Sequence, residues 1–334
     1  MRKLLGQVVS LAGICIAIGY GHAQAAVLTA AGIAEGFTLS TFLDSVPASG
    51  ACCGPLGVAN TTGGIMVTNY FGDVKVFTDV DGHHWGDVPA PAASFGFANA
   101  VGLARVGGNF YMTQQAAATV VQLNADGTFN QGIVGGISSA TGIIGNPANG
   151  HVFVSDCCTF NNVWDVDPVA KTKALFNTPG GTPDGMAITP DGSTLYVSLD
   201  SGSKIVGFDT GTKALVFDSG LIGGGPDGTA LGFGILAGKI YANTNAGEVI
   251  EIDLATKAQT VIVTGGTRGD FIGVDETNGT LLFTQTSEIL RLTPPTGGCI
   301  GNQCAVPEPS GIALTALAML LAPLSARVRK ASRC

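Results

Sequence analysis

The sequence predicts an all-β chain that folds as a six-bladed β-propeller, and three observations support this prediction. The chain contains 50 glycines in 334 residues, and no segment between Ala26 and Ala305 keeps the 3.6-residue apolar period of a helix. Short apolar runs alternate instead with turns rich in Asp and Gly, which is typical of β-structure. Similar segments also recur, because glycines at positions 57, 102, 142, 185 and 228 lie 45, 40, 43 and 43 residues apart.

The clearest unit lies in the middle of the chain. Four short strands are expected at residues 183–189, 193–198, 204–209 and 213–218, joined by tight turns such as Pro190-Asp191-Gly192. Four antiparallel strands with tight connections make one propeller blade. Five further units follow the same plan, each with an inner, a second and a third strand. In chain order these strands are expected at 56–59, 64–69 and 73–77; 101–103, 109–113 and 120–124; 141–143, 151–156 and 162–167; 227–230, 239–243 and 248–253; and 271–274, 280–284 and 288–292.

The sixth unit lacks an outer strand because Pro294-Pro295 stops it. Residues 36–44 have the pattern of an outer strand and no blade of their own. We therefore expect this N-terminal strand to complete the last blade and close the ring, which leaves only short edges exposed. A seven-bladed ring is the alternative count. The unit at 183–218, with Leu195-Tyr196-Val197-Ser198 after its turn, resembles the YVTN/NHL type of propeller repeat.

The N-terminus has the pattern of a secretory signal peptide over residues 1–25. Arg2 and Lys3 precede a mostly apolar run, and Ala23-Gln24-Ala25 is a small-x-small cleavage site. The propeller is expected to span residues 26–298, followed by a linker at 299–305.

The C-terminus, residues 306–334, reads as a sorting signal. Val306, Pro307, Glu308 and Pro309 precede a membrane segment at 312–326, whose apolar run is Ile312 to Leu324, and a basic tail follows. This order resembles the PEP-CTERM signal, whose Pro-Glu-Pro motif is recognised by the membrane protease exosortase in Gram-negative bacteria. The run of 13 residues is shorter than the ~17–25 residues that span a bilayer, which favours transient insertion. The resemblance implies processing by signal peptidase and exosortase, and a final location at the cell surface or outside the cell.

The charge distribution excludes one class of partner. Six of the sixteen Lys and Arg residues lie in the two terminal segments, which leaves ten basic and 24 acidic residues in 26–308. This net charge of −14 and the lack of a basic patch argue against nucleic-acid binding.

Six cysteines remain once the terminal segments are set aside, and an even number in an exported chain favours disulfides. They are Cys52, Cys53, Cys157, Cys158, Cys299 and Cys304. The last two are expected to close a short loop. The two vicinal pairs are expected on one face, since one precedes an inner strand and the other follows a second strand. Cross-links between these pairs, two vicinal disulfides, and a four-thiolate metal site all remain open, although adjacent cysteines differ from the usual zinc spacing.

Two places could bear a ligand. His83, His84 and Trp85 lie in one loop with Asp81 and Asp87, where they could hold a metal or stack against a sugar ring, although an exposed loop without such a role is the simpler interpretation. The six-blade count resembles the SMP-30/gluconolactonase hydrolases, which hold a divalent metal in the channel through Glu, two Asn and Asp. Asp184, in Pro183-Asp184-Gly185-Met186, is similar to that Asp. Cys53 and Thr141 stand where the Glu and an Asn would be expected.

These observations leave two functions open. The first is a non-catalytic exported propeller that binds a polysaccharide or surface protein, associated with exopolysaccharide or biofilm matrix, as the PEP-CTERM resemblance implies. The alternative is a metal-dependent lactonase. No phosphate loop or catalytic helix motif is present, so the sequence favours the first function, without catalytic residues and without a resident cofactor.

Overall fold

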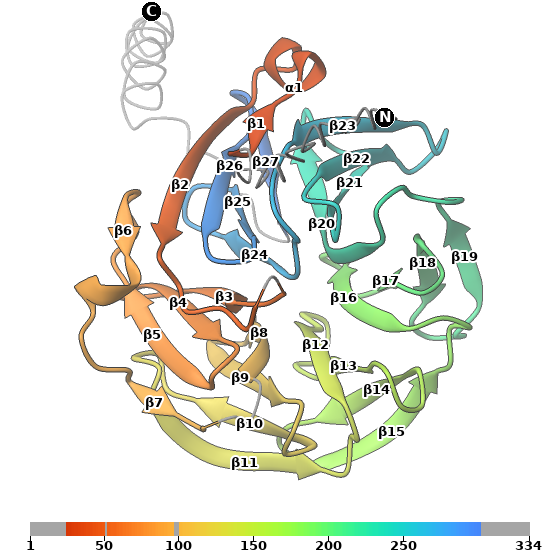
Figure 1. Cartoon of the computed structure of the whole chain (residues 1–334). Coiled ribbons are helices and arrows are strands. Elements are labelled where there is room, and N and C mark those ends of the chain that lie inside the picture. The colour runs from red at the N-terminus through yellow and green to blue at the C-terminus, as the bar shows by residue number, and fades with distance from the viewer. Residues whose placement is uncertain (1–24, 51, 97–99, 302–334) are drawn as a thin grey trace, which may run out of the picture.

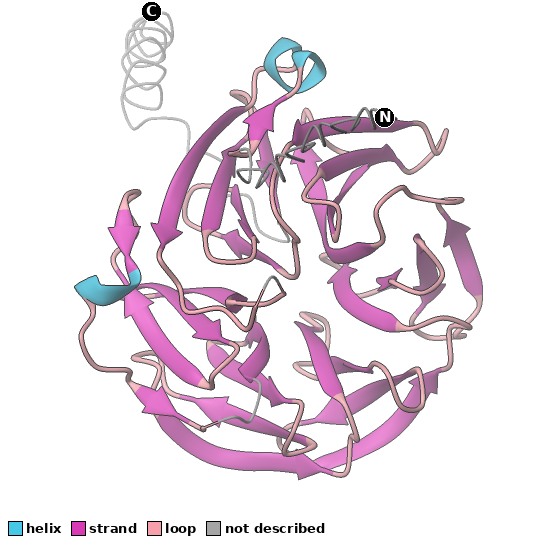
Figure 2. Ribbon diagram, viewed as in Figure 1, coloured by secondary structure: helices cyan, strands magenta, loops and turns pink. Residues whose placement is uncertain are grey.

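The computed structural model describes residues 25–50, 52–96 and 100–301. Six β-sheets of four to six strands surround a central axis as the blades of a propeller (Figure 1). Within these residues, helix is confined to α1 (Ala30–Ala34) and the 3₁₀ turn η1 (Trp85–Asp87), which lie at the rim (Figure 2). The six-bladed prediction is confirmed.

Blades one to four each consist of four antiparallel strands, which are consecutive in the chain except that β6 (His83–His84) lies between the last two strands of blade one. They are β3 (Pro55–Thr61), β4 (Gly64–Asn69), β5 (Asp73–Phe77) and β7 (Ala93–Ser94); β8 (Ala100–Val106), β9 (Asn109–Gln114), β10 (Thr119–Leu123) and β11 (Phe129–Gly135); β12 (Ala140–Gly145), β13 (Val152–Asp156), β14 (Asn162–Asp167) and β15 (Thr172–Asn177); and β16 (Pro183–Ile188), β17 (Thr194–Leu199), β18 (Lys204–Asp209) and β19 (Leu215–Asp218).

Blades five and six contain the two ends of the described chain. Their consecutive strands are β20 (Pro226–Gly234), β21 (Lys239–Thr244), β22 (Val249–Asp253) and β23 (Gln259–Thr264), then β24 (Ile272–Asp275), β25 (Thr280–Thr284) and β26 (Ile289–Thr293). The N-terminal strand β2 (Thr38–Asp44) pairs antiparallel with β26 and is the outer strand of blade six (Figure 1). The expected closure of the ring is therefore confirmed.

Three further pairings are not anticipated by the sequence pattern. The two-residue strand β1 (Val27–Leu28) pairs with β23, and β6 (His83–His84) runs parallel to β2. Near the C-terminal end, β27 (Gly298–Ile300) pairs with β20. The first residues of the segment expected to be a linker thus belong to the propeller sheet, because they satisfy the free edge of β20.

Glycine allows the six inner strands to approach the axis closely. A Cβ atom on the inner-strand glycine of any blade would lie within 3.0 Å of the inner strand of the next blade. These glycines are Gly57, Gly102, Gly142, Gly185, Gly228 and Gly273. Their contacts pass from each blade to the next and return from Gly273 to Val58, so the inner strands run side by side in the same direction around the axis.

Hydroxyl groups on the second strands join neighbouring blades beside these inner-strand glycines. Thr68 Oγ1 accepts a hydrogen bond from the Gly57 N–H at 2.8 Å and donates to Val101 O of the next blade at 3.1 Å. Thr113 Oγ1 likewise accepts from Gly102 N–H and donates to Thr141 O. Each such bond satisfies buried backbone groups that the ladder leaves free.

Apolar side chains fill the space between adjacent blades. Phe153 and Phe176 of blade three pack edge to face with ring centroids 4.9 Å apart, and Phe176 contacts Phe208 of blade four at 6.4 Å. Met186 and Leu195 complete this cluster. Core packing therefore accounts for most aromatic and β-branched strand residues, as their alternation predicts.

We expect Gly142→Ala to destabilise the protein by about 1–3 kcal/mol, because overpacking forces the backbone apart. The new Cβ would meet Asp184 O of the next inner strand. The matched control is Gly132→Ala on an outer strand, where nothing lies within 4 Å of the added atom. Urea denaturation should show a lower midpoint for Gly142→Ala than for wild type. The free energy of unfolding of Gly132→Ala should lie within ~0.5 kcal/mol of the wild-type value. Equal midpoints for both variants would contradict close inner-strand packing.

Candidate functional site

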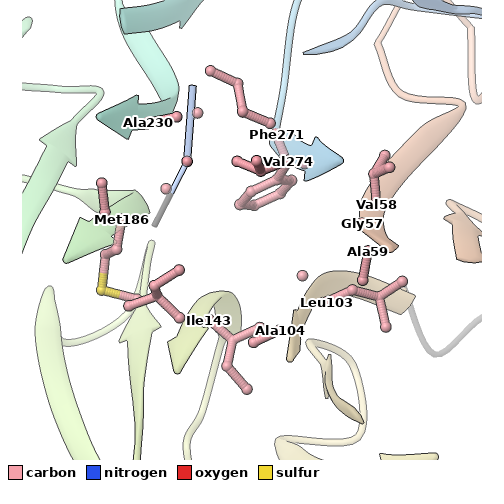
Figure 3. Close-up of a pocket in the computed structure, with 18 of the residues that line it drawn as sticks. Gly57, Val58, Ala59, Leu103, Ala104, Ile143, Met186, Ala230, Phe271 and Val274 are labelled. Atoms are coloured by element: carbon pink, nitrogen blue, oxygen red, sulfur yellow. The ribbon is translucent and has the colours of Figure 1, made fainter. Parts of the chain in front are cut away.

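The six inner strands surround a central channel with an apolar lining. Figure 3 shows Leu103, Ile143, Met186 and Phe271 from different blades around the same space. The enclosed cavity measures about 100 Å³. We call the end at which the inner strands begin the mouth and the opposite end the far end. The far end is lined by Glu276 and Arg105, whose carboxylate and guanidinium lie 2.8 Å apart.

Three aspartates lie at the mouth, one from each of blades four, five and six. Asp184 and Asp227 are the second residues of β16 and β20, and Asp270 directly precedes Phe271 and β24. The inner strands that bear these residues lie against one another at glycines, since Gly185 lies against Asp227 and Gly228 lies against Phe271 and Ile272. The packing of three successive blades therefore brings together three carboxyl groups, each 43 residues from the next along the chain.

Several polar atoms at the mouth are enclosed without a hydrogen-bond partner in the part of the chain that the structure describes. They are Asp184 Oδ1, Asp227 Oδ1, Asp270 Oδ2, Asn243 Oδ1 and Ser198 Oγ. Buried polar atoms are nearly always paired, so an unpaired group calls for an explanation such as a catalytic role. Ser198 interrupts the series of hydroxyl bridges formed by Thr68 and Thr113, and it does so in the same blade as Asp184.

Arg268 supplies the positive charge of this cluster. Its Nη2 lies 3.3 Å from Asp227 Oδ2 and 3.1 Å from Asp270 Oδ1, and its Nε donates to Asn245 Oδ1. The side chain of Arg268 is 32% exposed, whereas those of Asp227 and Asp270 are 2% and 7% exposed. The guanidinium therefore lies between solvent and the buried carboxylates.

The environment changes the acidity of all three carboxyl groups. Burial raises the pKa of Asp184 to about 7, opposed by a side-chain hydrogen bond with Asp227. Burial, followed by the charge of Asp184, raises the pKa of Asp227 well above its usual value. Burial, followed by the charge of Asp227, raises the pKa of Asp270 to about 7. Asp184 and Asp227 thus form a carboxyl pair that holds a proton near neutral pH.

The cysteines form two vicinal disulfides, Cys52–Cys53 and Cys157–Cys158. This arrangement selects one of the three possibilities that the sequence leaves open. Cys53 directly precedes the residues that lead into β3, and Cys157 directly follows β13. Since Pro55 pairs with Asn69 and Ala140 pairs with Asp156, both disulfides lie at the mouth, as expected. Cys299 is disulfide-bonded as well, while Cys304 lies outside the described residues.

The mouth does not fit the divalent metal that the SMP-30 resemblance implies. A set of carboxylate and amide oxygens suits a hard cation. However, the guanidinium of Arg268 already pairs with two of the three aspartates. Within residues 25–50, 52–96 and 100–301, no group of three or more His, Cys, Asp or Glu side chains is placed to hold a metal ion. Cys53 and Thr141 also replace the expected Glu and Asn.

Asp184 is expected from the sequence only as a candidate metal ligand, and Asp227, Asp270 and Arg268 are not among the expected site residues. Asp227 could have been found, because Pro226-Asp227-Gly228 repeats the Pro-Asp-Gly of Asp184 one blade later. Asp270 and Arg268 have no such local signal, since they belong to a loop between blades five and six.

The loop of His83 and His84 lies at the rim of the molecule rather than at the mouth (Figure 1). His84 Nδ1 lies 2.5 Å from Asp44 Oδ1, and His83 Nδ1 lies 3.4 Å from Asp87 Oδ2. Trp85 is only 7% exposed and Lys75 Nζ lies 4.3 Å from its ring centroid. The expectation that Trp85 presents an exposed stacking surface is therefore corrected: its ring packs on Phe77.

The processing signals lie outside the described residues. These are the cleavage-site residue Ala23 and the motif Val306, Pro307, Glu308 and Pro309, whereas Ala25, the last residue of the expected signal peptide, is the first residue that the structure describes. In the part of the chain that the structure describes, none of the helices has the length and apolarity needed to cross a membrane.

No protein-family model and no curated protein matches the chain. Solved structures with the same fold include a gluconolactonase from Xanthomonas campestris, with a TM-score of 0.63 and 17% identity over 81% of this chain and 95% of that one. A streptogramin B lyase matches with a TM-score of 0.50 and 18% identity, over 77% and 98% of the two chains. A chain of the nidogen/laminin complex matches with a TM-score of 0.54 and 14% identity, over 71% and 98%. At these identities the likeness establishes the propeller fold alone, since one fold hosts many functions.

Proposed function

We propose that the protein is a hydrolase of uncharged esters or lactones that acts at the mouth of the propeller channel. The observation that supports this most directly is the group of enclosed, unpartnered oxygens on Asp184, Asp227 and Asp270 beside the guanidinium of Arg268. Carboxyl groups with pKa values moved toward neutrality by burial are typical of acid–base sites. The gluconolactonase of similar fold is consistent with this reaction class.

The residues at the mouth can divide the chemistry of ester cleavage among them. Asp184 in its ionised form removes a proton from water as the water oxygen attacks the ester carbonyl carbon. Arg268 donates hydrogen bonds to the oxyanion that develops on the carbonyl oxygen, where a fixed positive charge stabilises the transition state. Asp227 in its protonated form gives its proton to the departing alkoxide when the carbon–oxygen bond breaks. Loss of a proton from Asp184 to solvent, and uptake of one by Asp227, restores the site.

The charge of the mouth indicates which substrates it accepts. Three aspartates and nearby Asp200 surround one arginine, and Asp200 adds to the raised pKa of Asp184. A negatively charged substrate would meet this acidic field, so neutral esters and lactones are favoured.

The test is hydrolysis of a panel of neutral chromogenic esters and small lactones by the purified chain. We expect Asp184→Asn to lower kcat/KM by about 10²–10⁴-fold, the usual contribution of a general base. Because the cation of the site is Arg268, EDTA should leave the wild-type rate unchanged.

Asp191→Asn is the matched control for this assay. Asp191 lies in an exposed turn of the same blade, where it accepts hydrogen bonds from Thr189 and Ser193, so its replacement should leave kcat/KM unchanged. Absence of hydrolysis with every substrate, or equal rates for Asp184→Asn and wild type, would refute the proposal.

We also propose, from the terminal sequence patterns alone, that the chain is exported, inserted transiently through residues 312–326 and processed by exosortase. Processing at the motif Val306–Pro309 should be lost on Glu308→Ala, and the mass of the secreted chain would measure this. Binding of exopolysaccharide or a surface protein remains the competing function, and a polysaccharide pull-down would test it.

A further inference from the structure

One of the two vicinal disulfides touches the cation of the mouth. Arg268 Nη1 lies 2.6 Å from Cys52 Sγ and 2.9 Å from Cys53 Sγ. The contact joins residues more than 200 positions apart in sequence and therefore depends on closure of the ring between blades six and one. A positive charge beside sulfur stabilises thiolate over thiol.

The other vicinal disulfide contacts neutral side chains and follows an acidic residue, since Asp156, which accepts a hydrogen bond from Ser139 N–H, directly precedes Cys157. The Gln115 amide nitrogen lies 3.5 Å from Cys157 Sγ, and the Ser139 hydroxyl lies 3.8 Å from the same atom. Each pair has one buried and one more accessible member: Cys53 is 8% and Cys157 is 3% exposed, whereas Cys158 is exposed and Cys52 is partly exposed. The chain thus contains two chemically matched disulfides that differ in the charge beside them.

Cys52 and Cys53 have few other titratable neighbours. They pack against Leu56, Val101, Phe271 and Tyr70. The carboxylates of Asp227 and Asp270 pair with Nη2 of Arg268, whereas the two sulfurs lie beside Nη1. Arg268 is therefore the charged group in direct contact with the two sulfurs.

We infer that Cys52–Cys53 is a redox-active site, which a small dithiol reduces to a thiolate-bearing pair held by Arg268. The thiolate of the dithiol attacks Cys52 Sγ, the more accessible sulfur, and the bond between the two sulfurs breaks. Cys53 leaves as a thiolate beside Arg268 Nη1. The second thiol of the dithiol then attacks the mixed disulfide, releases Cys52 and becomes part of a cyclic disulfide. Two electrons thus pass to the protein, Cys52 takes up one proton, and the other proton of the dithiol goes to solvent while Cys53 stays a thiolate. A leaving thiolate of low pKa departs faster, which favours this pair over Cys157–Cys158.

The first test compares the two pairs within the wild-type chain. The protein is incubated with dithiothreitol, quenched with iodoacetamide at a series of pH values from 5 to 9, and analysed by peptide mass spectrometry. We expect Cys53 to be alkylated with a midpoint at least about one pH unit below that of Cys157 and Cys158, since an adjacent cation lowers a thiol pKa. A midpoint equal to or above that of Cys157 and Cys158 would overturn the inference. If exposure alone set the reactivity, Cys158 would be alkylated more readily than Cys53, because Cys158 is the most accessible of the four cysteines.

The second test removes the charge. Arg268→Gln should move the Cys53 midpoint toward that of Cys157, whereas Arg268→Lys should retain part of the difference. Arg105→Gln, at the far end of the channel, is the control that should leave every midpoint unchanged. Unchanged Cys53 reactivity in a folded Arg268→Gln protein would refute the role of Arg268, and folding is checked by circular dichroism. Should that variant fail to fold, the wild-type comparison still decides the question.

A consequence for activity follows, and it rests on the proposed function. A thiolate at Cys53 would compete with the developing oxyanion for Arg268, so reduction should lower kcat/KM for ester hydrolysis by about tenfold. The alkylation midpoints need no substrate. A protein that hydrolyses no ester but has a low Cys53 midpoint would refute the hydrolase and support the redox site. A protein that hydrolyses esters but has a Cys53 midpoint equal to that of Cys157 would refute the redox site and support the hydrolase.

Discussion

Replacing Arg291 by Met is expected to lower the free energy of unfolding by about 3–5 kcal/mol, the usual cost of breaking a buried ion pair from one side. Arg291 lies on β26 with its side chain 6% exposed. Its three nitrogens bind three aspartates: Asp79 at 2.5 Å, Asp81 at 2.7 Å and Asp275 at 2.9 Å. Two of these belong to the loop after β5 of blade one, so the guanidinium ties the last blade to the first. Without it, the fully buried carboxylate of Asp275 loses its counter-charge.

Urea denaturation would measure this change, and a thermal melt should fall by roughly 10 °C. Arg105→Met is the matched control, because Arg105 forms one ion pair with both partners about 30% exposed. Exposed pairs contribute little, about 0–1 kcal/mol. Similar losses for the two variants would show that closure between blades six and one depends on packing and on the strand pairing of β2 with β26, rather than on Arg291.

The stability of the wild-type protein is expected to fall between pH 5 and pH 8. Burial raises the pKa values of Asp184 and Asp270 to about 7, well above their ordinary value near 3.8. Between these values the folded state binds more protons than the unfolded state. The free energy of unfolding therefore decreases as pH rises, and the stabilising effect of the bound proton is lost as pH passes through 7. Over two pH units one such group contributes about 2–3 kcal/mol.

Asp184→Asn removes one of these groups. The free energy of unfolding of this variant, measured in urea and compared with that of wild type, should therefore be more favourable at pH 8 than at pH 5. Asp191→Asn is the control, since hydrogen bonds from Thr189 and Ser193 lower the pKa of Asp191 to about 2. This carboxylate is ionised at both pH values in the folded and unfolded states, so its removal should cause the same change at each. If the free energy of unfolding changed with pH equally in wild type and in Asp184→Asn, the pKa of Asp184 would not be raised in the folded protein.

The same substitution is thus expected to increase stability and remove activity. A mouth with three buried carboxyl groups and several unpartnered oxygens costs folding free energy. Such a cost is common at sites selected for chemistry rather than for stability.

Local patterns in the sequence were enough to predict the six blades. Period-2 alternation and Asp/Gly turns located the strands of each unit, and Pro294-Pro295 with the unpaired strand at 36–44 predicted the closure seen between β2 and β26. These signals are local because a strand, a tight turn and a missing edge each depend on a few consecutive residues.

The site, in contrast, depends on the closed ring. Asp184 could be noticed through its resemblance, but the meeting of Asp184, Asp227 and Asp270 requires three blades to stand side by side, and Arg268 reaches Cys52 and Cys53 only across the junction of the last blade with the first. Trp85 shows the same limit, since it is buried in a cluster that includes Phe42 of β2 and Ile289 of β26. The sequence by itself determined the blades and their order, because these follow from short-range backbone preferences. Only the tertiary structure decided which charges and sulfurs meet at the mouth, because contacts such as that of Asp184 with Asp227 and that of Arg268 with Cys52 join residues 43 and 216 positions apart.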